Sequence, residues 1–510
     1  IYNKNPYGLD STMQTLYYEL PGIQNSGVVN PLIRLENEWD KTIDISYRTV
    51  GSLFAEINLL KNFTWKSTVY ADFSNQNKRE YKPVYYSYDP AIGKTFFTSS
   101  VSGVTENDNT AKKIQQDHIL TYKKQFNAHG FNASAGFTTY FNSFRSRTGT
   151  VQQSVTGAPI PDDPRFWYIN NGFGAQASQR STSDQWESST VSGLFRLLYN
   201  YNNKYYLNGS FRRDASSQIS PANRSQNFWA VGAAWEITKE SFMANVKAID
   251  FLKLKASVGV LGNQNTYLGN NPAPYPFYPG LVAGLGAPFG SLIYNAYAQA
   301  YLPNRNLKWE TVNSKEFGFE LNAFSNRLHF EASYFDKVTK DLMTYIPGNN
   351  GAANGLTNVG SIKNNGLELS ASWTQKLKNE LSFTVSGNLT TYKNKVLELA
   401  SKDFAIVNGP SWTVVGEPIG SFYGYVVEGL YQSYADKLAS PINTEFSYGP
   451  GDFKYKDVNG DGVINTKDRT VIGNPTPDFT YGGTISVAYK GFDIGVDVGG
   501  VYGNQIYRNW

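Results

Sequence analysis

The sequence predicts an all-β protein, more specifically a transmembrane antiparallel β-barrel with long extracellular loops. Three observations support this: many Tyr and Gly residues, apolar residues that alternate with polar ones, and short turns that alternate with long polar loops. The chain has 510 residues, including 36 Tyr, 31 Phe and 46 Gly. Tyr and Phe favour pleated strands, and Gly favours tight turns. The composition therefore favours strands over helices.

Two hairpins are the clearest predicted elements. Every second residue is apolar in 317–323 and in 328–334, and the turn FSNR separates these segments. The same pattern occurs in 367–373 and 381–389, on either side of QKLKNE. Further alternating segments lie at 63–73, 131–141, 191–199, 205–211, 254–260, 485–489 and 492–498. Many of their apolar faces end in an aromatic residue, as the girdles of a membrane barrel require.

Strand length and loop asymmetry favour a membrane barrel over a soluble sandwich. A tilted strand crosses a bilayer with about ten residues, the length expected here. Long loops are expected at 77–115, 142–186, 264–305 and 397–480. The mean hydropathy of −0.42 is compatible with this fold, because each barrel strand has only one apolar face. The chain should supply roughly fourteen to sixteen strands in one domain, residues 1–510.

Charge and residue counts argue against several function classes. The 46 Lys and Arg residues nearly balance 42 Asp and Glu, with no basic block that would bind nucleic acid. The chain has no Cys and only three His, and it lacks HExxH, Walker and GxSxG motifs, so no enzyme is predicted. The residues after Ile1 do not resemble a signal peptide, so if the chain is exported, its N-terminal segment is expected to be missing from this sequence.

Residues 451–472 contain a predicted structural Ca²⁺ site. The expected ligands follow calcium-loop spacing, with Gly462 at the sharp turn: Asp457, Asn459, Asp461, the Val463 carbonyl, Asn465 and Asp468. Gly and Pro residues on both sides exclude the helices of an EF-hand. Asp468 replaces the usual bidentate Glu, which predicts a weaker contact. The alternative is an Asx-rich turn that needs no metal.

Three consecutive aromatic residues are candidates for substrate contact. Phe166, Trp167 and Tyr168 lie in the Pro-rich loop PIPDDPRFWYINNGFG, which could fold over the mouth of a barrel. Their rings could stack on sugar rings. The alternative is a loop whose aromatic residues pack on the loop itself or on a lid.

Several segments, in order, resemble the SusC/RagA family of TonB-dependent outer-membrane transporters. The longest are FRRDASSQISPANRSQNFWAVGAAWEITKESFM at 211–243, LKLKASVGVLGNQ at 252–264, LKWETVNSKEFGFELNAFSNRLHFEASYFDKVTKDLM at 307–343, NVGSIKNNGLELSASW at 358–373, GEPIGSFYGYVVEGLYQ at 416–432, and GPGDFKYKDVNGDGVINTKDRTVIGNPTPDFTYGGTISVAYKGFDIGV at 449–496. The resemblance is dense from about residue 190 to the end.

The resemblance implies a 22-stranded barrel with an internal plug, in the outer membrane of a Bacteroidetes-type Gram-negative cell. It also implies import of oligosaccharides or peptides, a SusD-like lipoprotein as lid, and energy supplied through TonB. The N-terminal extension, the TonB-contacting segment, the plug and the last strands are expected outside residues 1–510. Two other function classes stay open: a secreted, soluble, calcium-dependent binding module, and a passive porin that needs neither lid nor plug.

Overall fold

The structure is a computed structural model of the chain. It describes residues 7–9, 15–18, 30–89, 93–154, 157–173, 179–268, 271–273, 275–346, 354–377, 380–401 and 404–508. The chain divides into two compact units. The first contains residues 1–55, 66–118 and 138–190. The second contains residues 56–65, 119–137 and 191–510.

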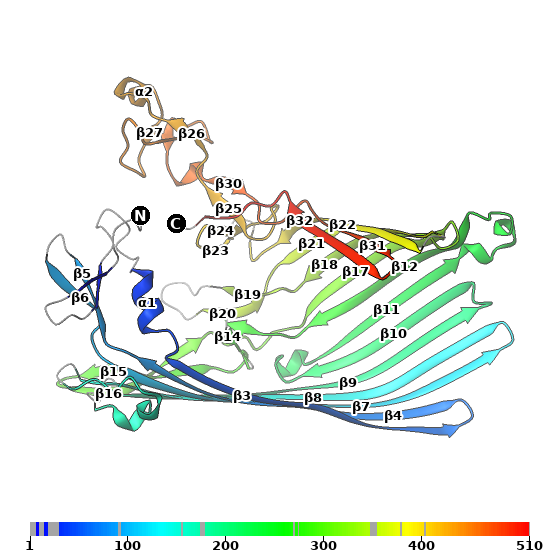
Figure 1. Cartoon of the computed structure of the whole chain (residues 1–510), viewed down its shortest axis with the longest axis horizontal. Helices are drawn as coiled ribbons and strands as arrows, with labels where there is room; N and C mark the ends of the chain where they lie inside the picture. The colour runs from blue at the N-terminus through cyan, green and yellow to red at the C-terminus, as the bar shows by residue number, and fades with distance from the viewer. Residues whose placement is uncertain are drawn as a thin grey trace. The chain divides into compact units, whose positions relative to one another are not determined.

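The dominant element is an antiparallel sheet of fourteen strands, each beside its neighbours in chain order (Figure 1). Its strands are β3 (Thr42–Leu60), β4 (Phe63–Lys82), β7 (Gly103–Phe126), β8 (His129–Gln152), β9 (Arg180–Tyr201), β10 (Tyr205–Ser216), β11 (Ser225–Glu236), β12 (Ile249–Asn263), β17 (Glu310–Ala323), β18 (Leu328–Lys340), β21 (Ser361–Lys376), β22 (Leu381–Glu398), β31 (Phe479–Tyr489) and β32 (Phe492–Tyr502). The predicted all-β antiparallel class is therefore confirmed, and the fourteen strands described in this sheet lie within the predicted range of fourteen to sixteen.

The sheet has one apolar face and one polar face. In one row across β17, β18 and β21, Phe319 pairs with Ala332, which pairs with Leu369. Because side chains alternate along a strand, the adjacent row, which includes Glu368, points to the opposite side. Phe317, on the apolar face, is 57% exposed. A large apolar surface left exposed along strand after strand is the arrangement that lipid requires.

Both predicted hairpins are present. The β17–β18 turn places Phe324, Ser325 and Asn326 in the left-handed region, with φ values of 58°, 62° and 57°. Such a turn reverses the chain within four residues and keeps Ala323 paired with Leu328. The second hairpin pairs β21 with β22. The other predicted alternating segments lie within β4, β8, β9, β10, β12, β31 and β32.

The predicted boundaries of strands and loops were wrong, because the strands are longer than about ten residues. β7 and β8 each contain 24 residues. The connections between neighbouring strands of the large sheet are 83–102, 153–179, 264–309 and 399–478, so the first two are much shorter than predicted, the fourth is slightly shorter and the third is slightly longer. About ten residues suffice to cross the bilayer, so the remaining length pairs outside the lipid. There, both faces can meet water, and no apolar alternation marks the strand.

In its described residues, the first unit also contains a small sheet and three short helices. The sheet is formed by β1 (Tyr7–Leu9), β2 (Thr15–Tyr18), β5 (Tyr85–Asp89) and β6 (Lys94–Ser99). The helices are α1 (Pro31–Asn37), η1 (Pro164–Phe166) and η2 (Ile169–Asn171). Asn30 caps α1, since its side-chain oxygen accepts a hydrogen bond from the Leu32 amide at 3.1 Å.

The second unit carries short elements in its connections. The strands are β13 (Tyr267–Leu268), β14 (Asn271–Pro272), β15 (Gly280–Phe289), β16 (Leu292–Tyr301), β19 (Met343–Ile346), β20 (Gly355–Asn358), β23 (Ile406–Asn408), β24 (Ser411–Thr413), β25 (Ser421–Gly424), β26 (Val427–Leu430), β27 (Ile442–Asn443), β28 (Phe453–Tyr455), β29 (Val463–Ile464) and β30 (Thr470–Gly473). The helices are η4 (Pro221–Asn223), η5 (Ile237–Lys239), η6 (Ser241–Met243), α2 (Tyr434–Leu438) and η7 (Thr466–Asp468). Among the described residues, no helix has the length and apolar character needed to span a membrane.

The buried apolar residues that the structure describes form separate small clusters. The first unit contains one cluster: Tyr81, Val104, Val151, Ile160 and Trp167. The second unit contains two: one of Ile219, Phe228 and Trp309, and one of Ile362, Val396 and Leu399. Each cluster joins strand residues to residues of a connecting loop. These clusters therefore fix loops on strands.

Candidate functional site

Charged side chains form a network on the polar face of β12, β17 and β18. The Lys255 Nζ atom lies 3.0 Å from the Glu320 carboxylate and also contacts the Glu331 carboxylate. On the same face, His329 shares a 2.7 Å hydrogen bond with the Asn322 side chain. These side chains present fixed charges and hydrogen-bonding groups. The polar face can therefore contact water and polar solutes.

The predicted calcium loop, residues 457–468, is closed by its own Asp side chains. One oxygen of Asp457 accepts a hydrogen bond from the Gly460 amide at 2.7 Å, and the other accepts from the Gly462 amide at 2.7 Å. Gly462 has a φ of 82°, a value that favours glycine. The sharp turn predicted at Gly462 is therefore present.

Asp468 is the buried centre of this loop, with none of its surface exposed. Its carboxylate accepts backbone hydrogen bonds from Asn465 at 2.8 Å and Val458 at 2.9 Å. A longer bond comes from Asn459 at 3.4 Å. The Asn465 amide and the other backbone amides lower the pKa of Asp468 below its usual value. Asp468 therefore remains ionised at neutral pH.

The remaining predicted ligands lie in the same turn. The Asp461 side chain accepts from the Val463 amide at 2.9 Å, and the Asn459 side chain accepts from the Asp461 amide at 3.0 Å. The Asn465 side chain caps η7 by accepting from the Lys467 amide at 2.9 Å. Within the part of the chain that the structure describes, no three His, Cys, Asp or Glu residues are arranged to hold a metal. These bonds are those of an Asx-rich turn, so calcium binding stays a prediction.

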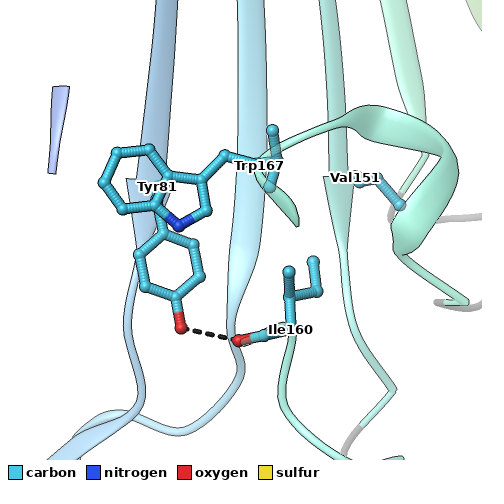
Figure 2. Packing of buried hydrophobic residues seen from close by; sticks show 5 residues of the cluster. Tyr81, Val151, Ile160 and Trp167 are labelled. Atoms are coloured by element: carbon cyan, nitrogen blue, oxygen red, sulfur yellow. Dashed lines mark hydrogen bonds between the residues drawn. The ribbon is translucent and has the colours of Figure 1, made fainter. Parts of the chain in front are cut away.

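The three predicted substrate-contacting aromatic residues have different environments. Trp167 is only 2% exposed and stacks on Tyr81, with ring centroids 5.1 Å apart and planes 5° apart (Figure 2). Phe166 and Tyr168 are each 44% exposed. The Arg79 guanidinium lies 4.6 Å from the centre of the Tyr168 ring. Trp167 therefore anchors the loop, as in the packing alternative, while its two neighbours remain accessible.

Residues that the sequence analysis missed hold this loop in place. The Tyr81 hydroxyl donates a 2.7 Å hydrogen bond to the Ile160 carbonyl, as Figure 2 shows. The Ile160 amide donates to the Ser102 hydroxyl at 2.8 Å, and Lys41 forms a 3.0 Å ion pair with Asp162. No local sequence signal could reveal these contacts, because they join segments far apart in the chain.

Asp163 caps a short helix, a role that was not predicted although the sequence contains a signal for it. It precedes Pro164, the first residue of η1, and its side chain accepts from the Arg165 amide at 2.9 Å. An Asp followed by Pro is a typical helix start. The Arg165 guanidinium, followed by the Arg165 backbone amide, lowers the pKa of Asp163 to about 2. The carboxylate therefore caps the helix at neutral pH.

Comparison with known proteins identifies the family. Residues 2–508 match the family model described as TonB dependent receptor-like, beta-barrel. TonB-dependent receptor P26 of Formosa agariphila is 27% identical over 490 residues, which cover 94% of this chain and 47% of that protein. TonB-dependent receptor SusC of Bacteroides thetaiotaomicron is 27% identical over 339 residues, covering 63% of this chain and 32% of SusC. The chain thus spans about half, or less, of the length of these curated relatives.

A solved structure shows the same fold. The RagAB peptide transporter superposes with a TM-score of 0.76 at 19% identity, covering 95% of this chain and 50% of that one. The matched family consists of receptors and transporters, in agreement with the prediction that the chain is no enzyme. Since the family model covers nearly every residue, the chain belongs to the TonB dependent receptor-like β-barrel family of the outer membrane, as its resemblance to SusC/RagA transporters predicted.

Proposed function

We propose that this chain forms part of the wall of an outer-membrane importer for oligosaccharides or peptides. The observation that carries the proposal is the family match over residues 2–508. The two faces of the sheet support it. The apolar face, with residues such as Phe317 and Leu369, would contact lipid, and the polar face, with Lys255 and Glu320, would line the interior.

The same proposal includes energy coupling and a lid. TonB would supply energy through a segment outside residues 1–510, and a SusD-like lipoprotein would cover the extracellular mouth. The support comes from relatives: SusC is a TonB-dependent receptor, and the RagAB peptide importer is known in closed-closed and open-open states. The exposed rings of Phe166 and Tyr168 are proposed to contact substrate, with Trp167 holding them in position.

A structural calcium ion in loop 457–468 is the second part of the proposal. The available donors are carboxylates, carboxamides and a backbone carbonyl, which are the oxygen ligands that Ca²⁺ prefers. Ionised Asp468 suits a metal ligand, because a carboxylate must be deprotonated to bind a cation. The chemical types of these donors therefore support the proposal. Its role would be to stiffen the 399–478 connection.

TonB-dependent uptake tests the main proposal. Cells that lack the gene should regain uptake of a labelled oligosaccharide or peptide pool when the full-length gene is restored, but only in a strain with functional TonB. Equal uptake with and without TonB would favour the passive porin instead. A restored protein that is released into the medium as a soluble species would favour the secreted binding module.

A further inference from the structure

Two aromatic rings of the first unit lie on the polar face of the large sheet, where contact with lipid cannot account for them. The rings of Phe144 in β8 and Trp186 in β9 have centroids 6.0 Å apart and planes 31° apart. Phe144 is an odd number of residues from Phe141 on the apolar face, so its side chain points to the opposite side. Both rings are half-buried, and neither belongs to the buried cluster around Trp167.

This aromatic pair lies at the ends of β8 and β9 that the connection 153–179 joins. Trp186 is about 20 Å from Arg180, the first residue of β9, at roughly 3.3 Å per residue. In β8, the alternating apolar segment 131–141 comes before Phe144. Both rings therefore lie beyond the part of the strands that crosses lipid, on the side of the long connections. That side is the extracellular one in the proposed importer, where substrate arrives.

Polar side chains flank both rings along the two strands. Residues two positions apart in a strand point to the same side, so the neighbours of each ring at this spacing share its face. These neighbours are Asn142, Ser146, Asp184 and Ser188. Carboxamides and hydroxyls both donate and accept hydrogen bonds, and a carboxylate accepts them. The aromatic pair is therefore bordered by groups that suit a ligand with many hydroxyls.

A small residue faces the Phe144 ring from the neighbouring strand. The hydroxyls of Thr105 and Thr150 are 3.2 Å apart, which identifies these residues as a facing pair of β7 and β8. Paired residues of antiparallel strands advance in opposite directions, so the same register places Ala111 opposite Phe144. A methyl group covers little of a phenyl ring. The space for a ligand is therefore on the β7 side of the pair.

A chain of hydrogen bonds ends in an acceptor beside this space. The Gln76 side chain donates to the two Asp44 oxygens at 3.0 and 2.9 Å, and the Asn109 side chain donates to the Gln76 oxygen at 3.1 Å. An ionised carboxylate only accepts, so the direction of the chain is fixed. The Asn109 oxygen at its end is buried and, among the described residues, has no donor. Asn109 lies opposite Ser146 in the register above, and a ligand hydroxyl that displaces the side chains over its oxygen would restore the missing bond.

We propose that Phe144 and Trp186 bind a pyranose ring of the transported substrate, so that this importer carries an oligosaccharide and not a peptide. One face of a pyranose ring consists of C–H groups and can pack on an aromatic ring, while its hydroxyls meet the polar border. A peptide offers no ring with hydroxyls around its whole edge. The inference rests on the proposed import function and narrows its substrate class.

Titration of the full-length protein with a panel of sugars tests the inference. The panel contains maltohexaose, laminarihexaose, xylohexaose and mannohexaose, and binding is measured by calorimetry in detergent. At least one of these sugars should bind. Trp186→Ala should lower the affinity for that sugar by about tenfold or more, because it removes an aromatic contact at the centre of the site. Trp186→Phe should retain most of the affinity, since an aromatic ring remains.

Phe73→Ala is the matched control. Phe73 lies on the apolar face of β4 and is 42% exposed, so its loss should leave sugar binding unchanged. Heat-modifiable mobility on gels verifies that each variant is folded. A hexapeptide of alternating Gly and Ser is titrated as well. It should bind more weakly than the sugar, because it has backbone amides and hydroxyls but no ring.

Four results would overturn the inference: no binding of any sugar in the panel, an affinity that Trp186→Ala does not change, an equal loss in Phe73→Ala, or a hexapeptide that binds as tightly as the sugar. Uptake in cells separates this failure from a failure of the import function. TonB-dependent uptake that is restricted to peptides, or that Trp186→Ala does not affect, would refute the aromatic site alone. Uptake that never depends on TonB would refute the import function itself.

Discussion

The indole ring of Trp167 stacks face to face on the phenol ring of Tyr81, with planes only 5° apart. Tyr81 belongs to β4, and its hydroxyl also holds the Ile160 carbonyl. The loop is therefore fixed on the strand at two points, one through stacking and one through a hydrogen bond. This relationship makes the 157–173 segment a firm support for the two exposed rings beside it.

Replacement of Trp167 by Ala should release this loop. Loss of a buried Trp costs about 3–5 kcal/mol, and here that cost falls on the local packing between loop and strand. Hydrogen exchange and limited proteolysis should show faster opening of residues 157–173, while the rest of the sheet stays folded. Phe166→Ala is the matched control, because Phe166 is 44% exposed. Equal protection of the loop in both variants would contradict the assigned anchor.

Asp468→Asn should loosen the turn at residues 457–468. The carboxylate accepts three backbone hydrogen bonds, and an amide group in its place can accept on one atom only. Amide exchange at Val458 and Asn465 should accelerate at least about tenfold. Glu445→Gln, at an exposed position of the same connection, should change nothing. Unaltered exchange in Asp468→Asn would show that the buried carboxylate does not hold the turn.

Removal of calcium should affect the same turn if the ion binds there. In the full-length protein, chelation with EDTA should increase protease cleavage within 399–478 and leave the sheet intact, and added Ca²⁺ should reverse the effect. Asp457→Asn should weaken the response to calcium, because it removes a charged ligand. If cleavage is the same with EDTA and with Ca²⁺, the loop does not bind calcium and is an Asx-rich turn that needs no metal.

The Glu240 carboxylate predicts a pH dependence of stability. It accepts hydrogen bonds from the Tyr205 hydroxyl at 2.6 Å, the Lys204 ammonium at 2.9 Å and the Trp235 indole at 2.9 Å. These hydrogen bonds lower the pKa of Glu240 from 4.5 to about 2, and the bond from Tyr205 has the largest effect. A lowered folded-state pKa means that the contribution is complete above pH 4.5 and is lost as the pH falls towards 2.

Thermal unfolding of the wild type and of Glu240→Gln measures this contribution. The wild type should be more stable at neutral pH, and the difference should shrink between pH 4.5 and 2. Glu445→Gln, which replaces an exposed carboxylate, serves as the control and should show no such trend. A constant difference between the wild type and Glu240→Gln across this range would mean that the network does not depend on the ionised carboxylate.

The hairpins could be predicted because their signals are local. In β17 and β18 the alternation identifies the strands, and FSNR identifies the turn, so the pairing of Ala323 with Leu328 follows directly. The polar end of β8 could not be recognised in this way. Residues 142–152 were expected in a loop, yet they belong to the strand. Their pairing comes from neighbouring strands, which the local sequence does not reveal.

The site was predictable to a similar extent. The sharp turn at Gly462 followed from the spacing of the loop, whereas the complete burial of Asp468 did not. The sequence predicted that Trp167 lies in a functional loop, but not that it anchors this loop. The anchoring contacts involve Tyr81 of β4, which lies 79 residues before its hydrogen-bond partner Ile160 in the chain. None of these contacts leaves a pattern in a single segment.

The central claim is that the sheet is a membrane wall with one face towards lipid and one towards the interior. Because residues 1–510 contain no cysteine, single cysteines can carry spin labels on β17. The labelled positions are Phe317, Phe319 and Leu321 on the apolar face, and Glu316, Glu320 and Asn322 on the polar face. Gly318 is omitted, since a side chain there would meet the Ala332 carbonyl oxygen at 2.5 Å.

The measurement is the accessibility of each label to oxygen and to a water-soluble nickel complex, with the full-length protein in lipid vesicles. High oxygen accessibility should alternate with low accessibility, and the three apolar positions should be the ones exposed to lipid. That period-two pattern would establish the membrane wall. Uniform accessibility to the nickel complex at all six positions would contradict it.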